Sequence, residues 1–402
     1  MKRLKLIFTE WKDNWFSSII TFIILTFAIF FFLVTFGKYR YIKYSYDLVS
    51  ETVDVENSVF FSDQTIFMSE DSHRSQYMDL FQQMGEIDAL SCIYGSMRRS
   101  VFVDGSLNNQ IIVCWDELRA LFPQRLLKGE WPEEGVNSDG SFNAVVGGDE
   151  LYGKQVGDVL ELKVSNESEP IRVKVSGVLS YPALLPRFNS TSNRMSTDDI
   201  FGNGNAIIVN DNEAVRALVE EANISFAPNF IIQFKEDANA EDVAYCKELL
   251  SSVGRFQDMS DVMENTEKKI QRTLKEELLF PCFLLFTAFL IYFSISILSV
   301  YKKIGNKAIY HLVGCSKRQV VTDVLIHLGI VCILSGLLNV LFALNYGYFF
   351  LWGFDLGAVL FDKYVILMVS GVVLLVYAVT AVVCAMIIKR KSPVALLRKF
   401  EN

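Results

Sequence analysis

The sequence predicts an integral membrane protein with four transmembrane helices and one large mixed α/β domain, carried on a helical stalk, between the first and second helix. The chain has 402 residues, of which 51% are hydrophobic, and its mean hydropathy is +0.29. An average soluble chain is about 45–50% apolar. The excess gathers in four long blocks without a charged residue. The long stretch between the first two blocks carries most of the acidic residues.

Each of the four apolar blocks is long enough to cross a membrane. They are Asn14–Gly37, Leu278–Tyr301, Val324–Phe354 and Tyr364–Ile388. A helix of about 20 residues crosses a hydrocarbon core of ~30 Å. The third block is longer than this, so we expect it to leave the membrane near Gly347. The first block is longer than the ~7–15 residues of a signal-peptide core and lacks a cleavage site, so we interpret it as an uncleaved signal anchor.

The basic residues of the short segments predict the orientation. They lie before the first block, between the second and third, and after the fourth, at Lys2, Arg3, Lys5, Lys12, Lys302, Lys303, Lys307, Lys317, Arg318, Lys389, Arg390 and Lys391. Short cytoplasmic loops carry an excess of Lys and Arg, whereas long domains translocate largely regardless of charge. We therefore expect both termini in the cytoplasm and a multi-pass protein of a plasma membrane, with a bacterial origin.

These boundaries give nine segments. They are a cytoplasmic N-terminus (1–13), the first span (14–37), an extracytoplasmic α/β domain with stalk helices (38–277), the second span (278–301), a cytoplasmic coupling loop (302–323), the third span (324–347), a short external loop (348–363), the fourth span (364–388) and a cytoplasmic tail (389–402).

The external domain shows both strand and helix patterns. Apolar and polar residues alternate over Ile171–Ser176, which is the period of a half-buried strand. Val159–Val164 and Asn229–Phe234 are further strand candidates, and we expect residues 159–178 to form a hairpin. A helix is predicted from Asn239 to Gly254, with these two residues as its caps.

Two stalk helices are predicted at the ends of this domain. Apolar residues recur at helical spacing from Met259 to Leu278, which predicts an amphipathic helix that runs straight into the second span. After the first span, four tyrosines fit either an interfacial aromatic belt or a second stalk helix, and we favour the helix. They are Tyr39, Tyr41, Tyr44 and Tyr46.

Composition argues against several classes of protein. The net charge of −8, without basic clusters in the large domain, argues against a nucleic-acid partner. Three histidines and seven cysteines form neither a CxxC pair nor a His cluster, so we expect no metal site. A Cys92–Cys114 disulfide stays open, although buried thiols are the simpler interpretation.

No pattern indicates a catalytic site. Gly148–Lys154 fits GxxxxGK, but Gln155 replaces the Ser or Thr that a phosphate-binding loop needs, so we interpret it as a turn. His73 is the only external histidine and has no nucleophile partner in the pattern. His327 lies inside the third apolar block, where an ionisable group suggests function, but a packed histidine is the simpler interpretation. We expect a non-catalytic subunit that holds no cofactor itself.

Three local patterns and the order of the spans resemble permeases of the MacB/FtsX type, which are membrane subunits of ABC transporters. The patterns are Asn143–Gly148 with Gly153, Val156–Leu160 and Val173–Val178 in the external domain, Ala308–Ser316 followed by Lys317, Arg318 and Gln319 in the cytoplasmic loop, and Ser392–Arg398 in the tail. The chain departs from the family pattern at Asn306, Lys307, His311, Cys315 and Leu396.

The resemblance implies a partner ATPase, which holds ATP and Mg²⁺ and docks on the cytoplasmic loop. The implied coupling residues are Lys303, Asn306, Lys307, Ala308, Ile309, Tyr310, His311, Leu312, Val313, Gly314, Cys315, Ser316 and Arg318. A second permease copy or a sister permease would complete the transporter, with an extracytoplasmic adaptor or membrane fusion protein as a further candidate partner. From charge alone, the loop could instead anchor to anionic lipid.

Several functions fit such a subunit. We expect ATP hydrolysis to drive mechanical movement of the external domain, for peptide or antibiotic export or resistance. Lipoprotein release and control of a cell-wall hydrolase are alternatives that use the same mechanism. A membrane receptor without an ATPase is the alternative from another class. The sequence leaves the substrate open, and it also leaves open whether the permease is a homodimer or a heterodimer.

Overall fold

The computed structural model describes residues 15–62, 83–84, 87–94, 96–103, 106–114, 126–132, 136–147, 154–163, 170–179, 184–186, 194–203, 206–210, 229–302, 316–346, 356 and 358–390. The chain divides into two compact units. Unit 1 comprises Met1–Arg40, Arg272–Tyr346 and Phe361–Asn402, and unit 2 comprises Tyr41–Gln271 and Gly347–Leu360. Each unit is described by itself.

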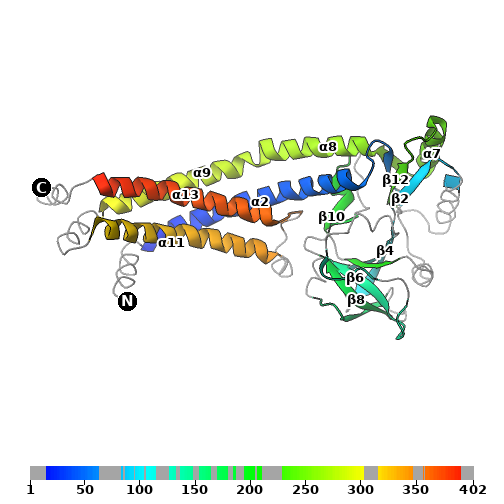
Figure 1. The fold of residues 1–402 in the computed structure, drawn as a ribbon, viewed down its shortest axis with the longest axis horizontal. Helices are drawn as coiled ribbons and strands as arrows, with labels where there is room; N and C mark the ends of the chain where they lie inside the picture. The colour runs from blue at the N-terminus through cyan, green and yellow to red at the C-terminus, as the bar shows by residue number, and fades with distance from the viewer. Residues whose placement is uncertain are drawn as a thin grey trace, which may run out of the picture. The chain divides into compact units, whose positions relative to one another are not determined.

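Unit 1 is a bundle of four long helices (Figure 1). They are α2 (Trp15–Thr52, which continues into unit 2), α9 (Leu279–Lys302), α11 (Lys317–Leu344) and α13 (Lys363–Arg390). All four are long and apolar enough to cross a membrane. Many of their large apolar side chains, such as Phe283 and Leu367, are exposed, which suits contact with lipid. The predicted class of four membrane helices with a mixed α/β domain is confirmed.

Small residues bring α11 and α13 close together. A Cβ atom added at Gly336 would lie 2.9 Å from Val373 Cγ2, and one added at Gly329 would lie 3.3 Å from Tyr377 Cε2. Small residues at helix contacts in membranes allow this close approach of two backbones.

The larger sheet of unit 2 closes into a ring of strands. Its strands are β3 (Ser96–Val103), β4 (Ser106–Cys114), β5 (Leu126–Gly129), β6 (Phe142–Gly147), β7 (Val159–Lys163), β8 (Ile171–Leu179) and β11 (Ala206–Asn210). The order is β5-β8-β6-β11-β4-β3-β7, and β7 pairs again with β8. Closure removes free strand edges, and buried Val146, Leu162 and Ile207 belong to the core of this sheet.

The smaller sheet of unit 2 has four strands in the order β13-β1-β12-β2. They are β1 (Ser58–Ser62), β2 (Leu90–Tyr94), β12 (Asn229–Phe234) and β13 (Arg255–Asp258). Helix α7 (Ala240–Val253) packs on this sheet, because Cys246 and Leu250 share one buried cluster with Phe61 and Ile232.

The predicted elements of unit 2 are confirmed. Strands β7, β8 and β12 lie where the alternation predicted them, and β7 and β8 pair as an antiparallel hairpin. The Asn239 side chain caps α7 by accepting from the Glu241 backbone N–H, and Gly254 ends the helix with extended backbone. Cys92 Sγ lies 3.9 Å from Gln233 Oε1. The side chain of Cys114 lies outside the described part of the chain, so a Cys92–Cys114 pairing stays open.

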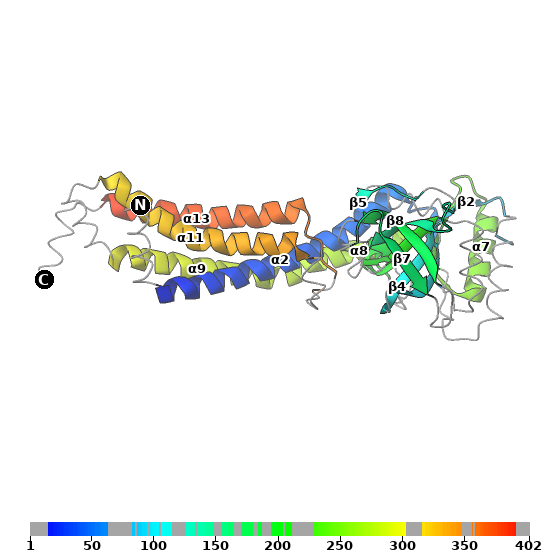
Figure 2. The same cartoon turned by 90° about the horizontal axis from the view of Figure 1, so that it is seen from below.

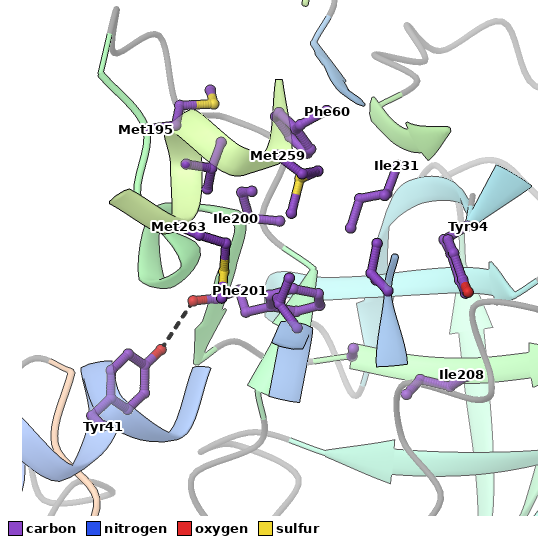
Figure 3. Close-up of a cluster of buried hydrophobic side chains, with 14 of the residues drawn as sticks. Tyr41, Phe60, Tyr94, Met195, Ile200, Phe201, Ile208, Ile231, Met259 and Met263 are labelled. Carbon is purple, nitrogen blue, oxygen red and sulfur yellow. Dashed lines mark hydrogen bonds between the residues drawn. The ribbon is translucent and has the colours of Figure 1, made fainter. Parts of the chain in front are cut away.

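Two helices build the remaining core of unit 2 (Figure 3). Helix α2 continues to Thr52, and its Tyr41 is 1% exposed in a cluster with Met259 and Met263 of α8 (Met259–Arg272). The expected second helix is therefore confirmed, and an aromatic belt is the wrong interpretation for Tyr41. The same cluster holds Ile200 and Phe201, from α5 (Thr197–Ile200) and β10 (Phe201–Asn203). Strand β10 pairs with β9 (Leu184–Pro186).

The predicted passage of the amphipathic helix straight into the second span is confirmed, because Met259–Tyr301 form one helix of 43 residues. This helix has one feature that the pattern did not predict. Five residues between α8 and α9, Thr273–Glu277, form a π-helical turn. Helical spacing over Met259–Leu278 fits an α-helix and a π turn almost equally well over so few residues, so the pattern could not separate them.

Candidate functional site

The predicted coupling loop lies mostly outside the described part of the chain. This holds for residues 303–315, which include Gly314, and for the side chain of Arg318. The histidines at 73 and 311, the turn at Gly148–Gly153 and the side chain of His327 also lie outside it. Ser316 is described, and it is the residue at which helix α11 begins.

Ser316 and Gln319 form a capping box at the start of α11. The Gln319 backbone N–H donates to Ser316 Oγ at 3.3 Å, and the Ser316 backbone N–H donates to Gln319 Oε1 at 2.9 Å. Two backbone donors of the first turn are thereby satisfied. The pair of Ser and Gln three residues apart was visible in the sequence, and our sequence analysis overlooked it. The box fixes the position at which the loop ends and the helix begins.

Two polar side chains of α11 contact the backbone of α2 inside unit 1. Asn339 donates to it, whereas the single hydroxyl proton of Ser335 has a closer acceptor in its own helix, the Val331 carbonyl oxygen at 2.9 Å. Asn339 Nδ2 lies 3.2 Å from the Thr26 carbonyl oxygen, and Ser335 Oγ lies 3.4 Å from the Phe22 carbonyl oxygen. Both donors are buried, at 1% and 0% exposure. A polar group in a membrane span needs an internal partner, because lipid offers none. These residues therefore join α11 to α2.

Helix α11 also accepts hydrogen bonds from the other two spans. The Tyr292 hydroxyl of α9 donates to the Leu328 carbonyl oxygen at 3.0 Å, and the Tyr377 hydroxyl of α13 donates to the Leu325 carbonyl oxygen at 3.2 Å. The two acceptors are three residues apart on α11. Together with the contacts to α2, they give α11 side-chain hydrogen bonds with each of the other three spans.

An ion pair joins α2 to the start of α13. Both Nη2 and Nε of Arg40 donate to Asp362 Oδ2, at 2.6 and 3.1 Å, and both side chains are 20% exposed. The other oxygen of Asp362 accepts from the backbone N–H groups of Tyr364 and Val365, at 3.1 and 3.0 Å. The Arg40 guanidinium also lies 4.8 Å from the centre of the Tyr364 ring. Asp362 therefore caps α13 and binds α2 at the same point.

In unit 2, the segment of residues 194–203 contacts two helices, α2 and α8. On the α2 side, Ser45 Oγ lies 2.8 Å from Thr197 Oγ1, and the Tyr41 hydroxyl donates to the Phe201 carbonyl oxygen at 3.3 Å (Figure 3). On the α8 side, the Thr197 backbone N–H donates to Thr266 Oγ1 at 2.9 Å.

An ion pair strengthens the α8 side of this segment. Lys269 Nζ lies 2.7 Å from Asp198 Oδ2 and 3.2 Å from Ser196 Oγ. The Asp198 side chain is 11% exposed and that of Lys269 is 40% exposed, so water screens this pair only in part. Three residues after the segment, the chain enters β11, which lies between β6 and β4 in the closed sheet. The segment therefore connects both helices to the middle of that sheet.

The polar contacts described so far are contacts between structural elements. Among the described residues, no group of three or more His, Cys, Asp and Glu side chains is placed to hold a metal ion. The buried polar groups named above serve to join helix to helix or helix to sheet. The segment 194–203 was absent from our sequence analysis, and its one signal is the capping box that Ser196 forms with Asp199.

Two solved structures are similar to part of the chain, although no curated protein is. The extracellular domain of the noncanonic ABC-type transporter YknZ from Gram-positive bacteria is similar, with 12% identity, a TM-score of 0.28, and coverage of 50% of this chain and 98% of that one. A domain of a protein described as a permease from Porphyromonas gingivalis is similar, with 10% identity, a TM-score of 0.27, and coverage of 51% and 87%. At TM-scores this low, neither likeness carries an argument.

The family match is confined to the membrane helices after α8. Residues 278–393 match the family described as FtsX-like permease C-terminal, and this range is less than half of the chain. It contains the whole of α9, α11 and α13. The second, third and fourth spans are therefore similar to the C-terminal region of FtsX-like permeases.

Proposed function

We propose that the chain is the permease subunit of an ABC transporter, with ATP hydrolysis on a separate partner chain. The observation that carries this proposal is the match of residues 278–393, which contain three of the four apolar helices, to the FtsX-like permease C-terminal family. ATP and Mg²⁺ belong to the partner in this proposal. A second permease copy or a sister permease completes the assembly, since ABC ATPases work as dimers.

The cytoplasmic loop is the docking site of the ATPase in this proposal, with Lys303, residues 306–316 and Arg318 as contacts. The capping box at Ser316 supports it, because a fixed helix start passes a displacement of the loop directly to α11. The hydrogen bond that α11 donates to α2, and those it accepts from α9 and α13, then connect this displacement to every span.

Two connections lead from the membrane helices to the α/β domain. Helix α2 is uninterrupted from Trp15 to Thr52, so it carries a displacement along its length. In unit 2, the contacts of residues 194–203 with Ser45 of α2 and Thr266 of α8 bring the displacement to β11. In this proposal the domain lies outside the cytoplasm of a bacterial cell, both termini lie inside, and the movement serves peptide or antibiotic export.

Co-purification tests the proposal. The tagged full chain is isolated from native membranes in a mild detergent, and the retained proteins are identified by mass spectrometry. We expect an ABC ATPase with the wild type and with Gly314→Ala. We expect none with Gly314→Pro, because proline removes a backbone N–H and fixes φ within the docking loop.

A thermal unfolding curve shows that each variant is folded. Absence of any ATPase from a folded wild-type chain would contradict the permease function. Retention of the ATPase by a folded Gly314→Pro variant would place the docking site elsewhere on the chain.

A further inference from the structure

The junction between α8 and α9 is a single π-helical turn. Its residues are Thr273–Glu277, and the Leu278 backbone N–H donates to the Thr273 carbonyl oxygen at 3.0 Å, five residues back. Such turns occur as single insertions within α-helices, often at functional positions. A π turn holds one residue more than an α turn, so the flanking helices keep the phase that they would have in a shorter, continuous α-helix.

The position of the turn distinguishes the two helical connections between the units. The chain passes from unit 2 to unit 1 between Gln271 and Arg272, and the turn follows at once. The other helical connection is α2, which passes from unit 1 to unit 2 after Arg40 and remains α-helical from Trp15 to Thr52. One connection is therefore regular, and the other carries an extra residue.

Packing does little to hold the turn in the π form. Among residues 271–277, only Thr273 is buried, at 2% exposure, and Leu274 is 41% exposed. The Arg272–Glu276 ion pair spans the turn at 3.0 Å, but its side chains are 72% and 66% exposed. Ion pairs this exposed contribute little. The side chains around residues 273–277 therefore contribute little to the stability of the π turn relative to an α-helical turn.

We propose that Thr273–Glu277 is a hinge that converts between π and α geometry, and thereby turns α8 relative to α9. One residue of an α-helix corresponds to about 100° of rotation and about 1.5 Å of length, so the conversion changes both by roughly these amounts. The hinge rests on the proposed function only for the source of the movement, which is the partner ATPase. Helix α2 has no such turn and acts as the rigid connection.

Deletion of one residue tests whether the turn is an insertion. Deleting the exposed Lys275 removes the extra residue and leaves both flanking helices in phase. Deleting the exposed Lys38 from α2 is the matched control, since it rotates the rest of that helix by about 100°. In the full chain in lipid nanodiscs, we expect the first deletion to shift the unfolding midpoint by no more than about 2 °C, and the second to lower it by at least about 5 °C. Equal losses would overturn the proposal.

Distances between spin labels test whether the turn moves. Labels are placed at the exposed positions 268 and 279 through Lys268→Cys and Leu279→Cys, in a full chain whose seven native cysteines are replaced. We expect two distances in the wild-type background and one after deletion of Lys275. A single distance in both backgrounds would overturn the hinge.

A further spin-label experiment tests whether the partner ATPase drives the hinge, independently of whether the turn moves. The co-purified ATPase and ATP are added to the labelled wild-type chain, and we expect the ratio of the two distances to change. If the ratio of the two distances does not change with the ATPase and ATP, the turn still moves, but ATP hydrolysis does not drive the movement.

Discussion

Replacing Thr266 with Val should destabilise unit 2 more than replacing it with Ser. The Thr266 hydroxyl is 0% exposed, accepts from the Thr197 backbone N–H at 2.9 Å, and donates to the Val262 carbonyl oxygen at 2.6 Å. Val keeps the shape of the side chain but leaves the buried Thr197 N–H without an acceptor. An unsatisfied buried donor costs about 1–3 kcal/mol, whereas the methyl group that Ser lacks is worth about 1 kcal/mol.

The measurement is the thermal unfolding midpoint of the purified full chain. For a unit of this size, 1 kcal/mol corresponds to about 2–4 °C, so Thr266→Val should lower the midpoint by about 2–12 °C. Thr266→Ser should cost about 2–4 °C, because it retains the hydroxyl. A Val variant that is as stable as the wild type, or more stable than the Ser variant, would refute the reasoning and assign the buried contact to the methyl group.

Three further predictions follow from packing and burial. Gly129→Ala should destabilise the chain by more than about 2 kcal/mol, because φ is +82° and the new Cβ would clash with the Ser176 carbonyl oxygen. Gly140→Ala, with φ +78° and open space around the new Cβ, should cost only about 1 kcal/mol in the same unfolding assay. Gly336→Leu should lower the unfolding midpoint by forcing α11 from α13, whereas Gly371→Leu, with nothing within 4 Å of its Cβ, should not. Burial raises the pKa of the Cys246 thiol, so just above its ordinary pKa of 9.0 the thiol ionises only in the unfolded chain. The free energy of unfolding should therefore fall as the pH rises above 9. Cys246→Ala should reduce this loss of stability with pH, measured by denaturant titrations at several pH values.

Local patterns were sufficient to predict part of unit 2. The alternation over Ile171–Ser176 and Val159–Val164 identified two strands and their hairpin, because the side chains of a half-buried strand alternate between core and solvent. The ends of α7 followed from Asn239 and Gly254, since capping depends on residues that are adjacent in the sequence. The four spans followed from length and apolar composition, which the bilayer imposes directly.

Closure of the larger sheet could not be predicted from the sequence. It depends on the pairing of β7 with both β8 and β3, and the β3 contact joins Phe102 to Lys163 and Val103 to Leu162. Such register depends on which distant strands share a core, and alternation within one strand does not reveal this. The contacts of residues 194–203 were missed for a similar reason, since Ser45, Thr197 and Thr266 are ordinary polar residues until the fold brings them together.

The contacts between α11 and α2 involve the backbone of α2. Asn339 Nδ2 donates to the Thr26 carbonyl oxygen, and four residues earlier on both helices, Ser335 Oγ faces the Phe22 carbonyl oxygen. Every residue of α2 offers a carbonyl, so these contacts place no requirement on the side chains of α2 at these two positions. The sequence of the first span therefore carries no signal of this attachment, and only the polar residues of α11 indicate it.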